Sequence, residues 1–386
     1  MDLLAARREL RITAMSRVLA MAALVTTAPA PPLSAQTAVP ILTARLAGSL
    51  PSKGLNIQHR DWMRVTSRGE ILLVQLKGQI IQRVSPSGAI SIWRDVIGHE
   101  PNAFFGGGGF VNDTFWVSNQ PGRFIVETDS DGRVLKKIPY PAVIVSPAGN
   151  RHAAPEVAGI LPLAMLPGGD LVLVPVSFEA TTFGDLLPPG EDGAPILAVD
   201  RSGHVTRTLG VEPLQDKCRQ HVQMGNQSGD VVIPLCPFPV TAASPDGTRL
   251  ISVTTVDPLT PHPSVTAVAL SAMGDTLYKR MLPYRPVPLP AAVFDSVAGS
   301  SAFQRPAVYP MYRTVIAGRD GSAWIGRWPT GGDTEWLVLD AKGSVSGSVQ
   351  FPKGFILETA DISTAWGFEP DDSGLLTIVW YRIAAQ

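Results

Sequence analysis

The sequence has few charged residues and no long run of one charge. Only 17% of its 386 residues are Asp, Glu, Lys or Arg, the formal net charge is −1, and no basic run exceeds two adjacent residues. A nucleic-acid-binding surface needs clustered Lys and Arg, and attachment to an anionic membrane needs a polybasic segment. The composition therefore argues against both, and we expect no nucleic acid as a partner.

Cysteine is scarce too, since Cys218 and Cys236 are the only two in the chain. An even count in an exported protein permits one disulfide, which would constrain the unfolded chain by about 3 kcal/mol in the loop-entropy picture. We therefore expect a Cys218–Cys236 disulfide. Two separate buried thiols are the alternative, and a metal pair fits less well because the spacing does not match a zinc pattern.

The amino terminus has the composition of an export signal. A basic start precedes the short apolar stretch 18–25, and Leu33-Ser34-Ala35 forms a cleavage site before Gln36. The apolar stretch is too short to span a bilayer. We expect a signal peptide over 1–35, starting at Met1 or Met15, an N-terminal segment over 36–55, and a folded domain over 56–386 in the periplasm or outside the cell. A disordered Ala-rich tail is the alternative.

Glycine and proline are abundant and lie between short apolar runs, which is typical of many strands and turns. One recurring pattern is a polar turn closing on glycine before an apolar run, as in 67–69 before 71–74; further copies lie at 167–169, 227–229, 245–247, 319–321 and 372–374. A second pattern is an alternating strand followed by a glycine turn, as in 81–84 before 86–88; further turns lie at 129–132, 200–203, 272–274 and 340–343. Both patterns predict hairpins.

Two hairpins in succession make a four-stranded antiparallel blade, with strands A to D, and blades stacked around an axis form a β-propeller. The hairpin count favours six blades, with seven as the runner-up and a β-sandwich array as a further alternative. Region 219–240 reads as a degenerate blade. The last hairpin, 356–381, needs outer strands from elsewhere, and 41–46 is placed to supply one and close the ring.

The glycine run 106–109 is not a phosphate-binding loop, because it lacks the Gly-Lys-Ser/Thr ending and a following helix. Glycines in a strand interior are typical of places where the backbone is approached closely. We therefore expect this run to be an inner strand packed near the crowded axis.

The first repeat, 67–72 through 82–88, resembles the blades of bacterial six-bladed propellers related to NHL-repeat propellers, and the likeness extends over roughly 55–383. The carboxy-terminal third, with 283–288, 319–324 and 336–340, is similar to an exported branch of these proteins. The resemblance implies a six-bladed propeller. It does not imply one activity, because such propellers include lactonases, lyases and binding modules.

The short A–B and C–D turns lie on one face of a propeller, here called the bottom face, and the B–C loops and blade-to-blade connections lie on the other, the top face. The long insertions 140–159, 177–193 and 284–309 are predicted to lie on the top face, where we expect binding residues. Histidines and carboxylates add to this expectation, and our candidate ligand-binding residues are His99, Glu100, Asn102, His152, Glu156 and His221. Drift in unselected loops is the alternative explanation of the insertions, and surface histidines without a common site are the alternative explanation of the cluster.

The leading hypothesis is a monomeric, exported binding or interaction module whose top face holds a small molecule, glycan or protein. The alternative is a metal-dependent hydrolase or lyase resembling the gluconolactonase or virginiamycin B lyase type. Its cofactor would be a divalent metal, since imidazole and carboxylate together suit zinc, manganese or iron, and the metal candidates are His99, Glu100 and His152. Structural filler in a cell-envelope assembly is a third reading.

Overall fold

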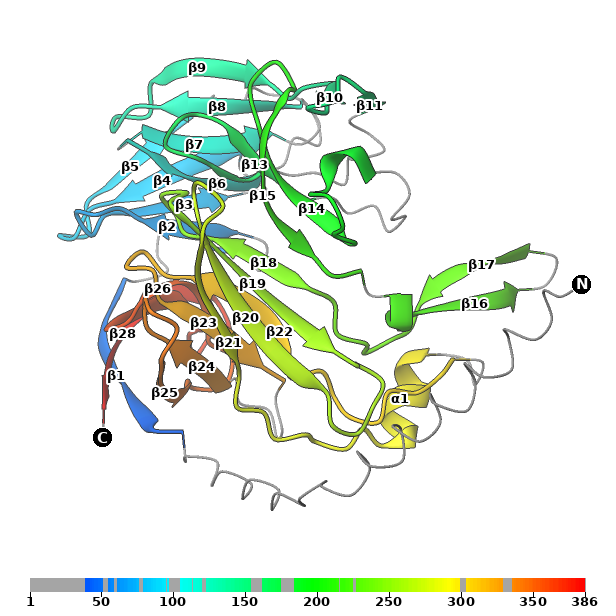
Figure 1. Cartoon of the computed structure of the whole chain (residues 1–386). Coiled ribbons are helices and arrows are strands. Elements are labelled where there is room, and N and C mark those ends of the chain that lie inside the picture. The colour runs from blue at the N-terminus through cyan, green and yellow to red at the C-terminus, as the bar shows by residue number, and fades with distance from the viewer. Residues whose placement is uncertain are drawn as a thin grey trace, which may run out of the picture. The chain divides into compact units, whose positions relative to one another are not determined.

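Short antiparallel strands make up nearly all of the regular structure (Figure 1). The computed structural model describes residues 39–386 except 51–54, 59–60, 76–78, 95, 97–104, 113, 120–122, 154–161, 175–183, 215, 225–226, 299–302, 329–334 and 386. The predicted signal peptide, residues 1–35, lies outside the described residues.

The first five blades each contain four consecutive strands, paired in chain order. Blade 1 holds β2 (Trp62–Val65), β3 (Ile71–Gln75), β4 (Ile80–Val84) and β5 (Ile90–Trp93), and blade 2 holds β6 (Phe105–Val111), β7 (Thr114–Asn119), β8 (Phe124–Thr128) and β9 (Val134–Pro139). Blade 3 holds β12 (Pro162–Met165), β13 (Leu171–Leu173), β14 (Ala194–Val199) and β15 (Val205–Glu212), and blade 4 holds β18 (Val240–Ala243), β19 (Arg249–Val256), β20 (Ser264–Ser271) and β21 (Thr276–Met281). Blade 5 holds β22 (Tyr312–Ala317), β23 (Ala323–Arg327), β24 (Glu335–Leu339) and β25 (Val345–Gln350).

Blade 6 is built from both ends of the chain. β26 (Ile356–Asp361), β27 (Thr364–Pro370) and β28 (Leu376–Ala385) supply three strands, and β1 (Ile41–Leu50) pairs antiparallel with β28 as the fourth. The segment 41–46 expected to close the ring falls within β1. At its start β1 also pairs in parallel with β25, where Ile41 and Leu42 face Ser348 and Val349, so blades 5 and 6 form one continuous sheet. The prediction of a six-bladed propeller of four-stranded antiparallel blades is confirmed.

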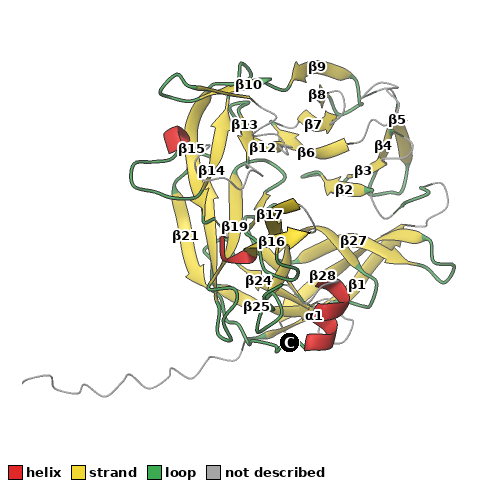
Figure 2. Ribbon diagram, turned by 90° about the vertical axis from the view of Figure 1, so that its right-hand side faces the viewer, coloured by secondary structure: helices red, strands yellow, loops and turns green. Residues whose placement is uncertain are grey.

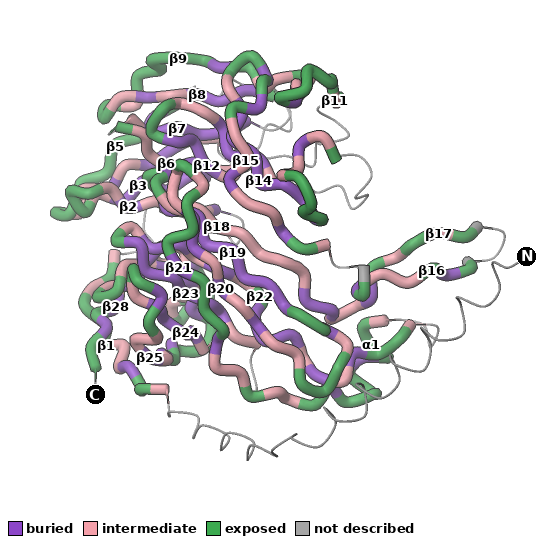
Figure 3. Tube along the Cα trace, viewed as in Figure 1, coloured by how far each residue is buried: buried purple, intermediate pink, exposed green. Residues whose placement is uncertain are grey.

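Turn chemistry explains why the chain reverses where it does. In the C–D turn of blade 5, Asp340 Oδ1 accepts hydrogen bonds from the backbone N–H groups of Lys342 and Ser344, and Gly343 has φ 78°. An aspartate that binds its own turn and a glycine with positive φ are the features that the sequence pattern uses. The cores then form between neighbouring blades, and many stretches of the blade strands are buried (Figure 3). Trp116 and Trp324 are almost fully buried in two of these cores.

The glycine run of β6 lies at a crowded point, as expected. A Cβ on Gly108 would lie 2.6 Å from the Trp62 ring and 2.7 Å from the carbonyl oxygen of Trp116. A Cβ on Gly109 would lie 2.5 Å from the carbonyl oxygen of Pro245, which accepts a hydrogen bond from the Phe110 N–H. Pro245 belongs to blade 4, so this bond joins blade 2 to a blade that is not its neighbour in the ring. A side chain at Gly109 would prevent so close an approach.

One prediction about the repeats was wrong. Region 219–240 is not a degenerate blade: β16 (Arg219–Met224) and β17 (Gln227–Val232) form a separate two-stranded hairpin in the connection between blades 3 and 4. The turn 372–374, a copy of the first turn pattern, joins β27 to β28, the B and C strands of blade 6, whereas the copies at 167–169, 245–247 and 319–321 join A to B strands. Turns of the same residue types join A to B strands in other blades and B to C strands in blade 6. Local sequence therefore does not tell which pair of strands a turn connects.

The top-face connections carry the remaining elements, which Figure 2 shows from that side. They are β10 (Val143–Val145), β11 (Arg151–Ala153), the single turns η2 (Gly184–Leu186) and η3 (Asp216–Cys218), and the helix α1 (Ala291–Ala298). A disulfide joins Cys218 and Cys236 at the base of the β16–β17 hairpin, where both are buried with Phe294 of α1. In the described part of the chain, no helix has the length and apolar character needed to span a bilayer.

Replacing Gly108 with alanine tests the packing of the inner strand. We expect Gly108→Ala to reduce the free energy of unfolding by about 1–3 kcal/mol, because the added Cβ overlaps the Trp62 ring and a backbone carbonyl. Urea unfolding followed by tryptophan fluorescence measures the change. Gly168→Ala is the matched control, because a Cβ there meets nothing within 4 Å. Equal midpoints for the two variants would contradict the proposed crowding.

Candidate functional site

A cavity of about 940 Å³ opens among the bottom-face turns. Its lining residues come from blades 1, 2, 4, 5 and 6, and most of them belong to the A–B turns or to the strand ends beside those turns. The sequence predicted a binding surface on the top face, so this cavity lies at the opposite end of the axis from the expected one.

Apolar side chains from blades 1 and 2 form one wall. Phe115 is at the centre, with ring centroids of Trp93 at 6.4 Å, Trp62 at 6.4 Å and Phe110 at 5.6 Å. Leu72 and Val65 continue this wall inward, and Leu135, whose side chain is more than half exposed, lies at the mouth. The wall is therefore held rigid by aromatic packing and can bury an apolar group.

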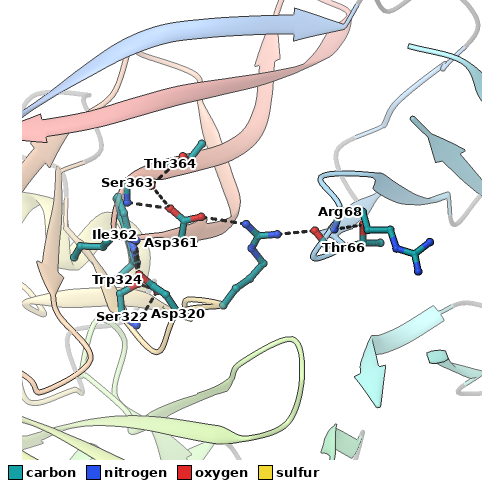
Figure 4. A network of polar contacts seen from close by, with 10 residues as sticks. Thr66, Arg68, Asp320, Ser322, Trp324, Asp361, Ile362, Ser363 and Thr364 are labelled. Atoms are coloured by element: carbon teal, nitrogen blue, oxygen red, sulfur yellow. Dashed lines mark hydrogen bonds and ion pairs between the residues drawn. The ribbon is translucent and has the colours of Figure 1, made fainter. Parts of the chain in front are cut away.

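Charged groups from blades 5, 6 and 1 form the opposite rim (Figure 4). Arg319 donates from Nη1 to the carbonyl oxygen of Thr66 at 2.6 Å and from Nη2 to Asp361 Oδ2 at 3.1 Å. Its guanidinium also lies over the Trp366 ring, 4.9 Å from the centroid. Asp361 is fixed in turn by hydrogen bonds from Ser363, and Asp320 accepts one from the Ile362 N–H. These contacts lock the turns of three blades together and set the shape of the rim.

Two arginines of blade 1 have different environments. Arg83 pairs with Glu70 at 2.5 Å and donates to the carbonyl oxygen of Ser130 in blade 2 at 2.8 Å, so its charge is balanced. The exposed Arg68, in the A–B turn, forms no ion pair and its guanidinium no hydrogen bond with the residues that the structure describes. The cavity thus has one cationic side chain at its rim that is free to meet a ligand.

Two further charged residues, Arg64 and Glu358, lie on the inner strands β2 and β26. Arg64 of β2 donates from Nε to the carbonyl oxygen of Gly108 at 3.0 Å and from Nη1 to that of Met63 at 2.9 Å. Burial raises the pKa of Glu358, on the neighbouring strand β26, to about 7, although the Arg64 charge and a hydrogen bond from the Met63 backbone oppose the rise. Burial also lowers the pKa of Arg64, and the Glu358 charge opposes that change.

His152 is a candidate residue that pairs with a carboxylate on another segment of the chain. Its Nε2 lies 3.0 Å from Asp185 Oδ1. This ion pair joins β11 to the η2 turn. Burial would raise the pKa of Asp185, but hydrogen bonds from Ser146, His152 and Asn150 outweigh it and hold the pKa at about 2. Leu186 of the same turn accepts a hydrogen bond from Thr208 on β15, so this pair fastens the top-face insertions along the outer strand of blade 3.

The other candidate residues do not form a common site with His152. His221 lies on the exposed face of the β16–β17 hairpin and pairs with Asp230 of the same hairpin, with Nδ1 2.9 Å from Oδ1. His99, Glu100, Asn102 and Glu156 lie outside the described residues. Among the residues that are described, no three His, Cys, Asp or Glu side chains come together as metal ligands. His152 and His221 therefore belong to two separate pairs rather than to one site.

Sequence reasoning missed the cavity and the Arg64–Glu358 arrangement. One signal for the latter was present: each residue is a charge in the middle of a short inner strand, and its two neighbours along the chain are uncharged. A charged side chain on an inner strand is enclosed by the neighbouring blades, and charged side chains are rarely enclosed unless they have a partner. No comparable signal marks the cavity, because its lining comes from turns that recur in every blade.

No protein-family model matches the chain, and no curated protein matches its sequence. Solved structures do show similarity. A PQQ-bound aldose sugar dehydrogenase from Streptomyces coelicolor is 14% identical, with 89% of this chain and 98% of that chain covered and a TM-score of 0.43. Virginiamycin B lyase from Staphylococcus aureus is 13% identical, with 88% and 100% covered and a TM-score of 0.38. Regucalcin, a calcium-binding protein from Agrobacterium tumefaciens, is 12% identical, with 90% and 97% covered and a TM-score of 0.39. At this identity none of them transfers an activity or a cofactor to this chain.

The raised pKa of Glu358 makes a prediction for stability. The folded protein holds this proton more tightly than the unfolded chain, whose carboxyl has the usual pKa of 4.5, so the free energy of unfolding should fall as the pH rises from about 4.5 to 7. We expect Glu358→Gln to match the native protein near pH 5 and to exceed it in stability near pH 8. Urea midpoints at both pH values measure this.

Glu335→Gln is the control, since Glu335 forms a direct ion pair with Arg327 at 2.7 Å and is more exposed. A Glu358→Gln protein that keeps the full pH dependence of the native protein would show that Glu358 is not the titrating group.

Proposed function

We propose that the protein is an exported binding module that holds a small amphipathic molecule, with an apolar body and an anionic group, in the bottom-face cavity. The observation that carries this proposal is the composition of the cavity. About 940 Å³ suits a molecule of drug or cofactor size, and such sites typically combine an apolar wall with a few polar groups. Here Phe115, Leu72 and Leu135 supply the wall, and Arg68 supplies a free cation at the rim.

The proposed location follows from two features of the sequence. Residues 1–35 have the composition of a signal peptide. The Cys218–Cys236 disulfide is stable in oxidising compartments such as the periplasm or the cell exterior. A small molecule is the partner class that we favour over a glycan or a protein, because the candidate surface is a cavity bounded by rigid turns and not a broad exposed face.

The rigidity of the rim turns favours ligand binding on the bottom face. The rim turns are short, and each is fixed by contacts to another blade, such as Arg319 to Thr66 and Arg83 to Ser130. A preformed site loses little conformational entropy when a ligand binds. The long top-face insertions, by contrast, are partly used to cover β15 and, through Phe294 of α1, to pack against the Cys218–Cys236 disulfide.

The proposal can be tested with anilinonaphthalene sulfonate, a fluorescent probe with an aromatic body and a sulfonate group. We expect saturable binding to the native protein and at least about tenfold weaker binding to Leu135→Asp, which removes apolar wall and adds a negative charge at the mouth. Arg68→Gln should weaken binding by a smaller factor, because it removes one solvent-exposed charge.

Leu277→Asp is the matched control. Leu277 is also exposed and is the second residue of an outer strand, β21 of blade 4, as Leu135 is of β9. It does not line the cavity. If Leu277→Asp weakens probe binding as much as Leu135→Asp, or if neither does, the probe does not occupy this cavity and the proposal is wrong.

A further inference from the structure

Arg64 and Glu358 lie where the inner strands of blades 6, 1 and 2 approach one another. Arg64 reaches from β2 to the Gly108 carbonyl of β6, and Glu358 of β26 accepts a hydrogen bond from the Met63 backbone of β2. Among the residues that the structure describes, each is the one charged group that acts strongly on the other. Both side chains are partly exposed to solvent. They belong to β2 and β26, which are inner strands, and the inner strands of a propeller surround its central channel.

The two charges do not neutralise each other directly. No ion pair forms between Arg64 and Glu358 within 4 Å, whereas Arg83–Glu70, Arg319–Asp361 and Arg327–Glu335 are all direct pairs in the same protein. Enclosing two charged groups without a direct contact is costly, because each loses water and gains little from the other. A group that sits between them and bonds to both would recover that cost.

The site has more hydrogen-bond donors than acceptors. Arg64 uses Nε and one hydrogen of Nη1, and its other N–H groups have no partner among the described residues. The Trp62 ring lies against the same guanidinium, with Cζ 4.9 Å from its centroid, and the Trp62 indole N–H is buried without a partner in the described chain. Glu358 adds an O–H donor when it is protonated. The nearest part of β6 is glycine and offers no side chain.

We propose that the axial channel binds a small carboxylate anion at the Arg64 guanidinium, beside the Glu358 carboxyl group. A carboxylate has two oxygens and no donors, so it matches a site that holds donors in excess and a positive charge. This site is separate from the bottom-face cavity: Arg64 does not line the cavity, although Thr66, two residues later on the chain, does. The proposal therefore stands whether or not the cavity binds an amphipathic molecule.

Binding should depend on pH in a defined direction. Below about pH 7 Glu358 is protonated, so the Arg64 charge is available to the anion; above it the Glu358 carboxylate competes for Arg64 and repels the ligand. If the anion requires protonated Glu358, its dissociation constant should rise by about 30-fold between pH 6 and pH 8.5. In the described part of the chain, Arg64 is the one charged group that acts strongly on Glu358.

Acetate is the probe, because it is a carboxylate with almost no other recognition feature. Its binding to the purified full-length protein can be followed by saturation-transfer NMR at about pH 6 and about pH 8.5, up to about 50 mM. We expect saturable binding at the lower pH, at least tenfold loss in Arg64→Gln, partial retention in Arg64→Lys, and binding independent of pH in Glu358→Gln. Arg327→Gln and Leu135→Asp should bind acetate as the native protein does.

Circular dichroism and urea unfolding establish that each variant is folded, and Arg64→Lys serves if Arg64→Gln does not fold. Three results would overturn the proposal: no saturable acetate binding at either pH, unchanged binding in Arg64→Gln, or a pH dependence that persists in Glu358→Gln. Displacement of acetate by an equal concentration of chloride would overturn the assignment to carboxylates. Loss of acetate binding in Leu135→Asp would place the anion in the cavity instead of the channel.

Discussion

The backbone pairing of β1 with β28 is the interaction on which the rest of this structure depends. A propeller blade packs only against its two neighbours, so the ring holds together only if the last blade is completed and pressed against the first. Here β1 completes blade 6 and also pairs with β25 at its start. The seam between blades 6 and 1 is then filled by a shared core that includes Met63, Leu73 and Phe368. Arg64 and Glu358 lie near each other across this same seam, and the Arg319–Thr66 bond joins blade 5 to blade 1, so neither the axial site nor the cavity rim would exist in an open ring.

The two faces of the ring have different roles, and loop length does not indicate which one binds. On the bottom face, short turns are tied to turns of other blades, as Phe110 is to Pro245 and Arg249 is to Gly321. These ties create a rigid surface with a cavity beside the axis. The long insertions that leave the top face perform structural work: the His152–Asp185 pair fastens two of them, and Val145 of the first donates to the Gly203 carbonyl in the C–D turn of blade 3. Covering an outer strand in this way protects an exposed sheet edge.

Charge pairing separates structural from functional candidates in this protein. Arg83, Arg319 and Arg327 each bond directly to a carboxylate and to a backbone carbonyl, so they act as cross-links. Arg64 bonds only to carbonyls, and the nearby Glu358 carboxyl stays largely enclosed with its pKa raised to about 7. A group with a pKa near neutral pH in an enclosed site is a functional candidate because its environment costs stability that a direct ion pair would not.

Local sequence determined the strands, the turns and the fold class. Apolar runs such as 71–74 between turns of Asp, Ser and Gly specify hairpins, and hairpins in succession without helical crossovers specify blades; the crowding at Gly108 also followed from composition. Only the tertiary structure decided that 219–240 is a hairpin outside the ring, that His152 meets Asp185, and that Arg64 meets Glu358. The physical reason is the range of the interactions. A turn is set by the few residues within it, whereas the partners of a side chain at the axis come from other blades and depend on how the whole ring packs and closes.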